Sequence, residues 1–328
     1  MNGRRMIFIL ALLMLLLPMG SCIHEYPSGS GVDPSKILTG IEIEFDLEWD
    51  YMIKQKSSYS SRSSLKKPHR FIIEITRNGE VTGRDYEYLS DDEFSQGILR
   101  HKLSFPLSAR TYDLIVWYDR DGENSDSPNY NIEDLNRISF ISKGIEYSSE
   151  HHSAFSREVL NLREYEGQTG ITVIKNIKLS HTGAKFELIA TDINEFITEN
   201  RPALLQGDSF SIKLSLEKGS SGTFNIFTGK INHDEVPLER TGKLLLPFAE
   251  YDELKIAEGF LFCDEEEDMK MTLSVFNSAQ IVVTRTEPFT LPVKRGIVTI
   301  LKGDFLTHPL NSPITVDHIW AGEHIIEI

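Results

Sequence analysis

Apolar and polar residues alternate in a long succession of short segments, and this alternation limits the possible folds more than any other feature of the sequence. The clearest case is Ile41–Trp49, in which five apolar residues alternate with four carboxylates over nine positions. A period of two places the apolar side chains on one face of an extended strand. Similar segments, joined by Gly, Pro and Asn turns, follow along the chain. The pattern predicts an all-β protein built from antiparallel β-sandwiches.

Individual strands can be placed from the same pattern. Asn78-Gly79 predicts a tight hairpin between Phe71–Ile75 and a strand that includes Val81. Lys102–Pro106 and Thr111–Trp117 are expected to pair around a short turn. In the second half we predict strands at Lys185–Ala190, Phe210–Leu216, Thr223–Phe227, Lys243–Pro247, Glu258–Phe262, Met271–Phe276, Ile281–Thr286, Phe289–Val293, Ile297–Leu301 and His324–Ile328.

Only two short helical segments are expected among these strands. Asp192–Asn200 begins with a capping residue, Asp192, and is expected to stop at Arg201-Pro202. Asn131–Asn136 fits a single helical turn. A Gly- and Thr-containing break precedes Ile171, where the alternation starts again. We therefore expect an N-terminal β-sandwich over residues 37–169 and a C-terminal β-sandwich over residues 170–328.

The first 21 residues have the organisation of a bacterial export signal. Arg4 and Arg5 precede eleven consecutive apolar residues, Ile7–Leu17, which is too short a run to span a bilayer. The small pair Gly20-Ser21 stands directly before Cys22, as in a lipobox. We expect residues 1–21 to be removed, Cys22 to carry lipid, and the Pro-, Gly- and Ser-rich residues 22–36 to form a flexible tether. The alternative is an ordinary signal peptide in which Cys22 has no role.

Charge and cysteine content restrict the partners and the source of stability. Removing residues 1–21 takes away two arginines and no acids, so the formal net charge of −15 becomes −17. Such acidity argues against binding nucleic acid and against general attraction to anionic lipid. Cys22 and Cys263 are the only cysteines. If Cys22 is lipidated, stability must come from packed apolar surface, and Cys263 is expected to be a buried apolar residue.

The segment Ile53–Arg70 differs from the strands around it, because it contains three serine pairs and six basic residues. This composition predicts a long exposed loop, and we expect it to be the part of the folded region that trypsin cuts first. The six basic residues are Lys54, Lys56, Arg62, Lys66, Lys67 and Arg70.

No motif of a known catalytic site is present: we find no nucleophile elbow, zinc-protease pair, P-loop or dinucleotide-binding glycine pattern. Asp119–Asp126 offers oxygen ligands near a glycine but lacks EF-hand spacing, so an acidic turn is the better interpretation. His151-His152 has no third metal ligand at a suitable spacing, and Asp264–Asp268 is expected to be a solvated acidic loop. The sequence therefore predicts no enzyme, no metal and no cofactor.

Several of these features together resemble the fimbrillin-type lipoproteins of the Bacteroidota. The resemblance rests on the lipobox cysteine followed by Ile-His-Glu, on the strand Tyr112–Asp119, and on Leu291–Gly296 leading into Val298–Thr307 before a short alternating end strand. It covers nearly the whole mature chain and is closest to the fimbrial anchor and assembly branch. It implies two tandem transthyretin-like β-sandwich domains, a location at the outer membrane, and other fimbrial subunits as partners. It brings no catalytic residues.

The resemblance also implies assembly by strand exchange, in which one subunit donates an extended strand to a groove of its neighbour. In stalk subunits of this family a trypsin-like protease cuts after a basic residue in the first loop, whereas an anchor keeps its first strand and its lipid. The sequence leaves open which type this chain is. The end strand His324–Ile328 is expected either to pair within its own sandwich or to be donated.

Two other functions remain open at this point. The first is a surface lipoprotein that binds a glycan or a host ligand through the loops at a sandwich edge. Trp49, Trp117 and Trp320 are far apart in the sequence, so no aromatic platform for such a ligand can be inferred. The second is a hydrolase of an unrecognised type, for which no nucleophile, base and orienting group can be nominated.

Overall fold

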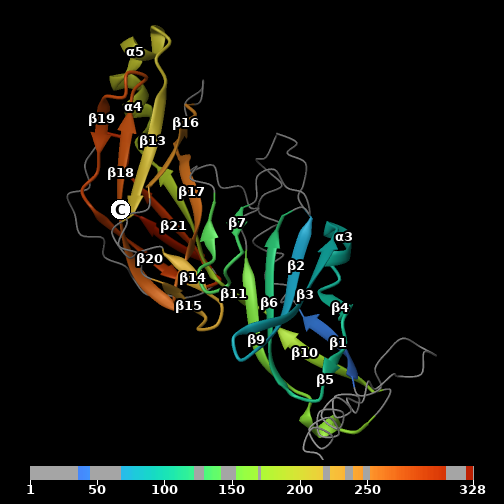
Figure 1. Ribbon diagram of the computed structural model, residues 1–328. Coiled ribbons are helices and arrows are strands. Elements are labelled where there is room, and N and C mark those ends of the chain that lie inside the picture. Colours follow the sequence, from blue (N-terminus) through green and yellow to red (C-terminus); the bar gives the residue numbers. More distant parts are fainter. Residues whose placement is uncertain are drawn as a thin grey trace, which may run out of the picture.

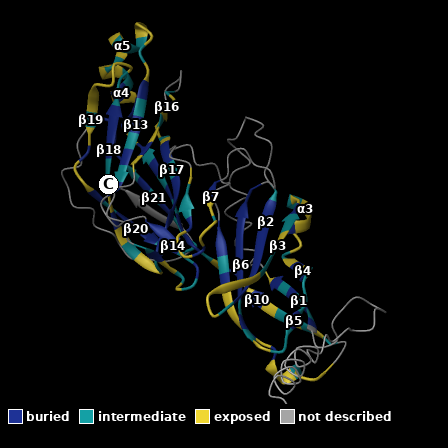
Figure 2. Ribbon diagram, in the orientation of Figure 1, coloured by how far each residue is buried: buried dark blue, intermediate teal, exposed yellow. Residues whose placement is uncertain are grey.

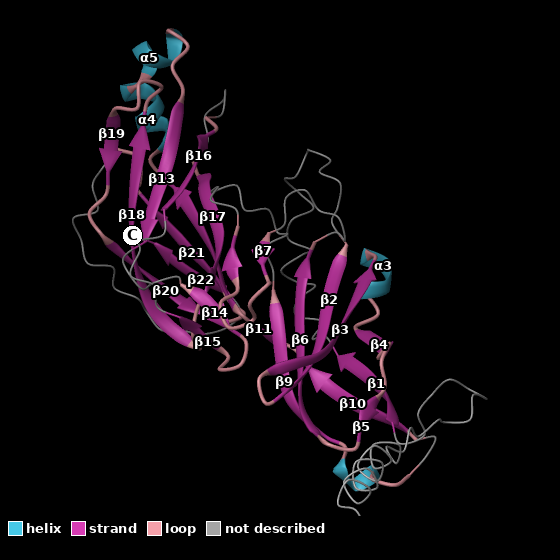
Figure 3. Cartoon of the chain, in the orientation of Figure 1, coloured by secondary structure: helices cyan, strands magenta, loops and turns pink. Residues whose placement is uncertain are grey.

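The computed structural model describes residues 36–44, 68–121, 129–141, 153–168, 171–216, 222–232, 239–246, 252–307 and 323–327. In these ranges most residues lie in β-strands, which are arranged as two neighbouring bodies, and the helices are few and short (Figures 1 and 3). The all-β fold expected from the alternation is confirmed. Among the described residues, no helix has the length and apolar content that a membrane span requires.

The N-terminal half consists of two facing sheets. In one sheet, in the order β10-β1-β4 with β5 attached to β1, the strands are β1 (Lys36–Glu44), β4 (Ile98–Lys102), β5 (Leu107–Ser108) and β10 (Thr172–Lys178). In the other, ordered β11-β9-β6-β2-β3, they are β2 (His69–Arg77), β3 (Glu80–Leu89), β6 (Thr111–Arg120), β9 (Ala154–Asn161) and β11 (Ser180–His181). Alternate residues of both sheets meet in one core, for example Ile41 of β1 and Phe71 of β2. Two short helices, α3 (Asp91–Phe94) and η3 (Arg163–Tyr165), connect strands.

The C-terminal half repeats this arrangement. One sheet, ordered β17-β12-β21-β22, contains β12 (Gly183–Ala190), β17 (Leu254–Phe262), β21 (Val298–Gly303) and β22 (Glu323–Glu327). The other, ordered β16-β13-β18-β19 with β20 attached to β18, contains β13 (Phe210–Leu216), β16 (Glu239–Leu244), β18 (Glu266–Phe276), β19 (Val282–Arg285) and β20 (Phe289–Lys294). Helices α4 (Ile193–Glu199) and α5 (Arg201–Leu205) lie at one end of this half (Figure 1).

A third apolar cluster joins the two halves. It forms because β6 is buried on both faces: Leu114 and Val116 point into the N-terminal core, and Ile115 and Trp117 point the other way. Two small hairpins complete the cluster, β7 (Tyr130–Asn131) with β8 (Ser139–Phe140) and β14 (Thr223–Asn225) with β15 (Lys230–Asn232). Ile138 and Phe224 exchange backbone hydrogen bonds of 2.9 and 2.8 Å between the two hairpin regions. Figure 2 shows that β6 is buried along most of its length.

The hairpin predicted at Asn78-Gly79 is present between β2 and β3. Both turn residues have positive φ angles, 54° for Asn78 and 81° for Gly79, as a type I′ turn requires. Ile41 and Ile43 of the first predicted strand are buried, and Glu44 is exposed, as the alternation predicts. The strand begins earlier than expected, at Lys36, and the predicted part beyond Glu44 lies outside the described residues.

Two local predictions were wrong, and a third was right but incomplete. Lys102–Pro106 and Thr111–Trp117 do not pair, because β6 pairs with β2 and β9 in the opposite sheet. Asn131 lies in β7, and the described residues 132–141 that follow it contain no helix. The helix predicted over Asp192–Asn200 is present as α4, with Asp192 at its N-cap position and its end at Glu199, before Arg201-Pro202. A second helix, α5, was not expected; it begins at Arg201 and carries Pro202 in its first turn, where a missing amide N–H is harmless.

Two charged segments also differ from the sequence expectation. Arg70, placed in the exposed loop, is buried in β2, and residues 53–67 of that loop lie outside the described residues. The acidic run Asp264–Asp268 is not a loop throughout, because β18 starts at Glu266 and pairs with β20. In both cases an antiparallel partner strand supplies the hydrogen bonds that the local composition does not suggest.

The division between the halves was predicted between residues 169 and 170, and strand pairing favours a later position. The strands that follow it, β10 and β11, pair with β1 and β9 of the N-terminal half. Leu179 between them packs into the N-terminal core. Because β10 and β11 pair with strands of the N-terminal half, we propose that the division lies near Thr182, where the chain passes into β12.

Candidate functional site

The first described strand, β1, fills an interior position of its sheet. It pairs in parallel with β10 over seven residues, from Leu38 with Thr172 to Glu44 with Lys178. On its other side it pairs antiparallel with β4 over five residues. We call the position between β10 and β4 the β1 slot. Since both neighbours depend on β1 for backbone hydrogen bonds, an empty slot would leave two unpaired strand edges.

The side chains of β1 make the slot energetically important. Ile37, Ile41 and Ile43 are each no more than 1% exposed and belong to the N-terminal core. Full burial of one such side chain contributes about 1.5–3 kcal/mol, so the three together contribute about 5–9 kcal/mol. This is comparable with the whole stability of a typical domain. The N-terminal half therefore needs a strand in this slot, either its own or one from another chain.

Polar contacts on β4 hold one wall of the slot independently of β1. The His101 ring nitrogens lie 3.0 Å from Asp85 Oδ2 and 2.9 Å from Glu87 Oε2, both on β3. The Ser104 amide donates to Asp85 Oδ2 at 2.7 Å. Burial alone would raise the pKa of Asp85, but the hydrogen bonds from His101 and Ser104 outweigh it and lower that pKa below its ordinary value. These contacts attach β4 to the opposite sheet.

The last described strand, β22, occupies an edge of its sheet. It runs parallel to β21 over five residue pairs, from Val298 with Glu323 to Lys302 with Glu327. No other strand in the described part of the chain pairs with its outer side. The end strand thus pairs internally here, which is one of the two arrangements expected for His324–Ile328. A strand added to a sheet edge in this way has the geometry of β-augmentation.

A buried ion pair that was not expected from the sequence lies between β2 and β6 of the N-terminal half. Arg70 of β2 faces Asp119 of β6 in the strand register. Arg70 Nε donates to Asp119 Oδ1 at 2.8 Å and Nη2 donates to Oδ2 at 2.7 Å, and Trp117 Nε1 also donates to Asp119 at 2.9 Å. The only signal in the sequence was a charged residue at the end of a continuous apolar strand. Asp119 is thus occupied by Arg70 and is not free to ligate a metal.

The other predicted site residues are placed as follows. Cys22, His151-His152 and residues 122–126 of the acidic stretch lie outside the described residues. Cys263 is fully buried and free, and burial raises the pKa of its thiol to about 12. A thiol with such a pKa is inert at neutral pH, in agreement with the apolar role expected for Cys263. The described ranges contain no cluster of three or more His, Cys, Asp or Glu suited to a metal.

Similar solved structures are described as adhesins, cell-adhesion proteins and a fimbrial anchor protein. A candidate adhesin of Bacteroides ovatus has a TM-score of 0.43 and 10% identity, over 76% of this chain and 75% of its own. The fimbrial anchor protein Mfa2 of Porphyromonas gingivalis has a TM-score of 0.41 and 14% identity, over 76% and 82%. A candidate cell-adhesion protein of Bacteroides eggerthii has a TM-score of 0.39 and 10% identity, over 87% and 94%.

Comparison with curated proteins finds no match. A family model does match, and it extends from residue 36 to residue 328. It thus begins with β1 and includes β22, the two strands that complete the sheets of the N-terminal and C-terminal halves. Because the match covers most of the chain, this protein belongs to DUF6562, a family of unknown function.

Proposed function

We propose that this protein is a lipid-anchored subunit of a surface fimbrium at the outer membrane, and that it joins other fimbrial subunits by exchanging β-strands. Lipid on Cys22 holds it to the membrane, and its role is structural rather than catalytic. The proposal is supported by the sequence resemblance to fimbrillin-type lipoproteins. The observation that carries it is the placement of β1 and β22, each of which completes a sheet at one end of the described chain.

The two strands have different parts in this proposal. β1 is interior and brings three buried isoleucines, so its removal is costly and the subunit keeps it. β22 is at an edge and pairs on one side only among the described strands, so its release breaks a single ladder. We therefore propose that β22 is the strand that is offered to a neighbouring subunit, and that the chain serves as an anchor rather than a stalk subunit.

Deleting Ile325–Ile328 tests the proposed donation. The truncated protein is expected to remain folded, exported and lipidated, but to hold few or no fimbriae on the cell, because the donated ladder is lost. Immunogold counting of fimbriae on cells, with fimbriae shed into the medium measured in parallel, gives the result. A matched control replaces Val282 and Val283 with threonine, since these residues lie on β19, the edge strand of the other C-terminal sheet.

The control variant is expected to keep its fimbriae. If the truncated protein melts at the wild-type temperature and still holds a normal number of fimbriae, β22 is not the donor strand.

Cys22→Ser tests the lipid anchor separately. A single acyl chain binds membranes only marginally, whereas a cysteine with several chains anchors stably. Cells grown with an alkyne fatty acid are expected to label the wild-type protein and to lose essentially all label in Cys22→Ser. Cys263→Ser is the matched control and should keep its label, because Cys263 is buried in the C-terminal core. Equal labelling of wild type and Cys22→Ser would refute the anchor.

A further inference from the structure

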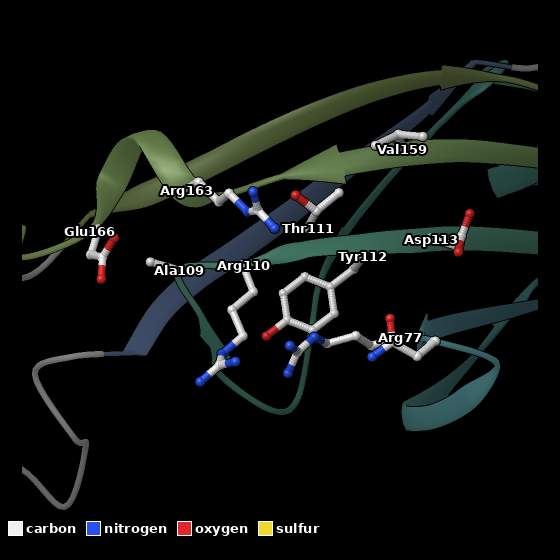
Figure 4. A pocket seen from close by; sticks show the side chains of 10 residues that line it. Arg77, Ala109, Arg110, Thr111, Tyr112, Asp113, Val159, Arg163 and Glu166 are labelled. Atoms are coloured by element: carbon white, nitrogen blue, oxygen red, sulfur yellow. The ribbon is translucent and has the colours of Figure 1, made fainter.

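A surface hollow of about 630 Å³ lies in the N-terminal half, close to the start of β1. This volume is within the range of small-ligand pockets, roughly 300–1,000 Å³. Three separate segments contribute one arginine each: Arg77 at the end of β2, Arg110 in the β5–β6 turn and Arg163 in η3. Figure 4 shows Arg77 and Arg110 beside the ring of Tyr112, and Arg163 near Thr111.

The floor of the hollow is rigid. Tyr112 is 5% exposed and packs into the N-terminal core. Its hydroxyl donates to the Ser108 carbonyl at 3.2 Å, which ties the ring to the β5–β6 turn. The Leu162 amide donates to the Arg110 carbonyl at 2.9 Å and connects the same turn to the segment after β9. The three arginines therefore project from a fixed backbone.

The positive charge of the hollow is largely uncompensated. Arg77, Arg110 and Arg163 form no ion pair with any residue in the described ranges. Of the two acids in the lining, Asp113 accepts from Arg157 at 3.1 and 2.9 Å, which leaves Glu166 as the other negative group. An oxyanion bound in the hollow would be attracted by the three guanidinium groups that line it. A guanidinium group also matches the geometry of a phosphate by donating two hydrogen bonds.

The position of the hollow indicates where such an anion comes from. Lys36, at the start of β1, pairs with Ser108, next to the lining residues Ala109 and Arg110. Lys36 lies fourteen residues after Cys22, and a chain of that length spans at most about 50 Å. If Cys22 carries lipid, this end of the protein is the end nearest the membrane surface.

We propose that the hollow binds the phosphate oxyanion of an anionic membrane lipid headgroup, through Arg77, Arg110 and Arg163. That the hollow faces the membrane rests on the proposed lipid anchor. That it binds an oxyanion rests on the arrangement of the three arginines. The overall negative charge of the chain repels an anionic surface, so binding depends on these three residues. A headgroup held here fixes the orientation of the N-terminal half above the membrane.

Vesicle binding by unlipidated protein tests the proposal. The mature chain, residues 22–328 with Cys22→Ser, is mixed with vesicles of phosphatidylcholine alone or with phosphatidic acid added. The test variant is Arg77→Gln, Arg110→Gln and Arg163→Gln combined. The charge-matched control combines Arg201→Gln, Lys243→Gln and Arg285→Gln, all exposed residues of the C-terminal half. A third arm measures binding of inorganic phosphate. Thermal unfolding verifies that each protein is folded.

Wild type and control are expected to bind only the vesicles with phosphatidic acid. The test variant should bind them about a hundredfold more weakly, because each basic residue at an anionic surface contributes about fivefold. Equal losses in the test and control variants, or no preference of the wild type for phosphatidic acid, would overturn the proposal. Arginine-dependent binding of inorganic phosphate without vesicle binding would overturn the membrane source. The assay needs no lipid on Cys22, so its result is independent of the labelling experiment.

Discussion

Replacing Arg70 with leucine is expected to lower the free energy of unfolding by about 3–5 kcal/mol, the usual cost of removing one partner of a buried ion pair. The Arg70 side chain is 9% exposed, and the carboxylates of Asp119 and Asp121 that it contacts are fully buried. Without the guanidinium, two desolvated carboxylates remain close together between β2 and the end of β6. Urea denaturation followed by circular dichroism measures the loss.

The variant should also show a stronger pH dependence than the wild type, in which burial already raises the pKa of Asp119 although Arg70 donates to it. Desolvation without a cation raises the pKa of a buried carboxyl group above its unfolded value of about 3.9. The folded variant then binds more protons than the unfolded chain between about pH 4 and pH 7, so its stability falls as pH rises through this window. The free energy of unfolding is measured against pH for both proteins. Subtracting the wild-type values from those of the variant separates this effect from that of other titrating groups.

Arg100→Leu is the matched control for this experiment. Arg100 Nε donates to Glu42 at 2.5 Å, but the Arg100 side chain is 74% exposed, so water screens the pair. Exposed pairs of this kind contribute less than about 1 kcal/mol, and no added pH dependence is expected. If Arg70→Leu cost no more than Arg100→Leu, the ion pair between β2 and β6 would have no special role in holding the N-terminal half together.

Replacing Phe224 with alanine is expected to cost about 3–5 kcal/mol as well, and to separate the unfolding of the two halves. Phe224 is fully buried in the cluster between the halves, and its ring centroid lies 4.9 Å from Phe155, 5.6 Å from Phe262 and 6.5 Å from Trp117. A ring removed here leaves a cavity against both halves. Scanning calorimetry should show one transition for wild type and two for the variant.

Phe196→Ala gives the control for the interface effect. Phe196 is also fully buried, and its ring lies 5.1 Å from Phe210, but both belong to the core of the C-terminal half. Phe196→Ala should lower the free energy of unfolding by a similar amount. It should not weaken the contact between the halves. A single transition at the wild-type temperature in Phe224→Ala would show that this cluster does not couple them.

For the candidate site, the sequence located the two end strands but not their roles. The alternation at Ile41–Trp49 identified a half-buried strand with Ile41 and Ile43 inward, and the burial of both residues agrees. It gave no indication that this strand lies parallel to β10, because its partner begins more than 120 residues later in the chain. Edge strands and interior strands show the same alternation of side chains. The pattern therefore could not show that β22 lies at an edge and β1 in the interior of its sheet.

What the sequence by itself determined is local: the all-β class, the face of each strand that is buried, and the hairpin at Asn78-Gly79. These follow from side-chain period and from φ preferences, which act over a few residues. The tertiary structure decided which strands are neighbours, and therefore that Arg70 lies opposite Asp119 and that Arg77, Arg110 and Arg163 share one hollow. Strand pairing joins residues far apart in the chain through backbone groups that are the same in every residue, so side-chain periodicity does not identify the partner.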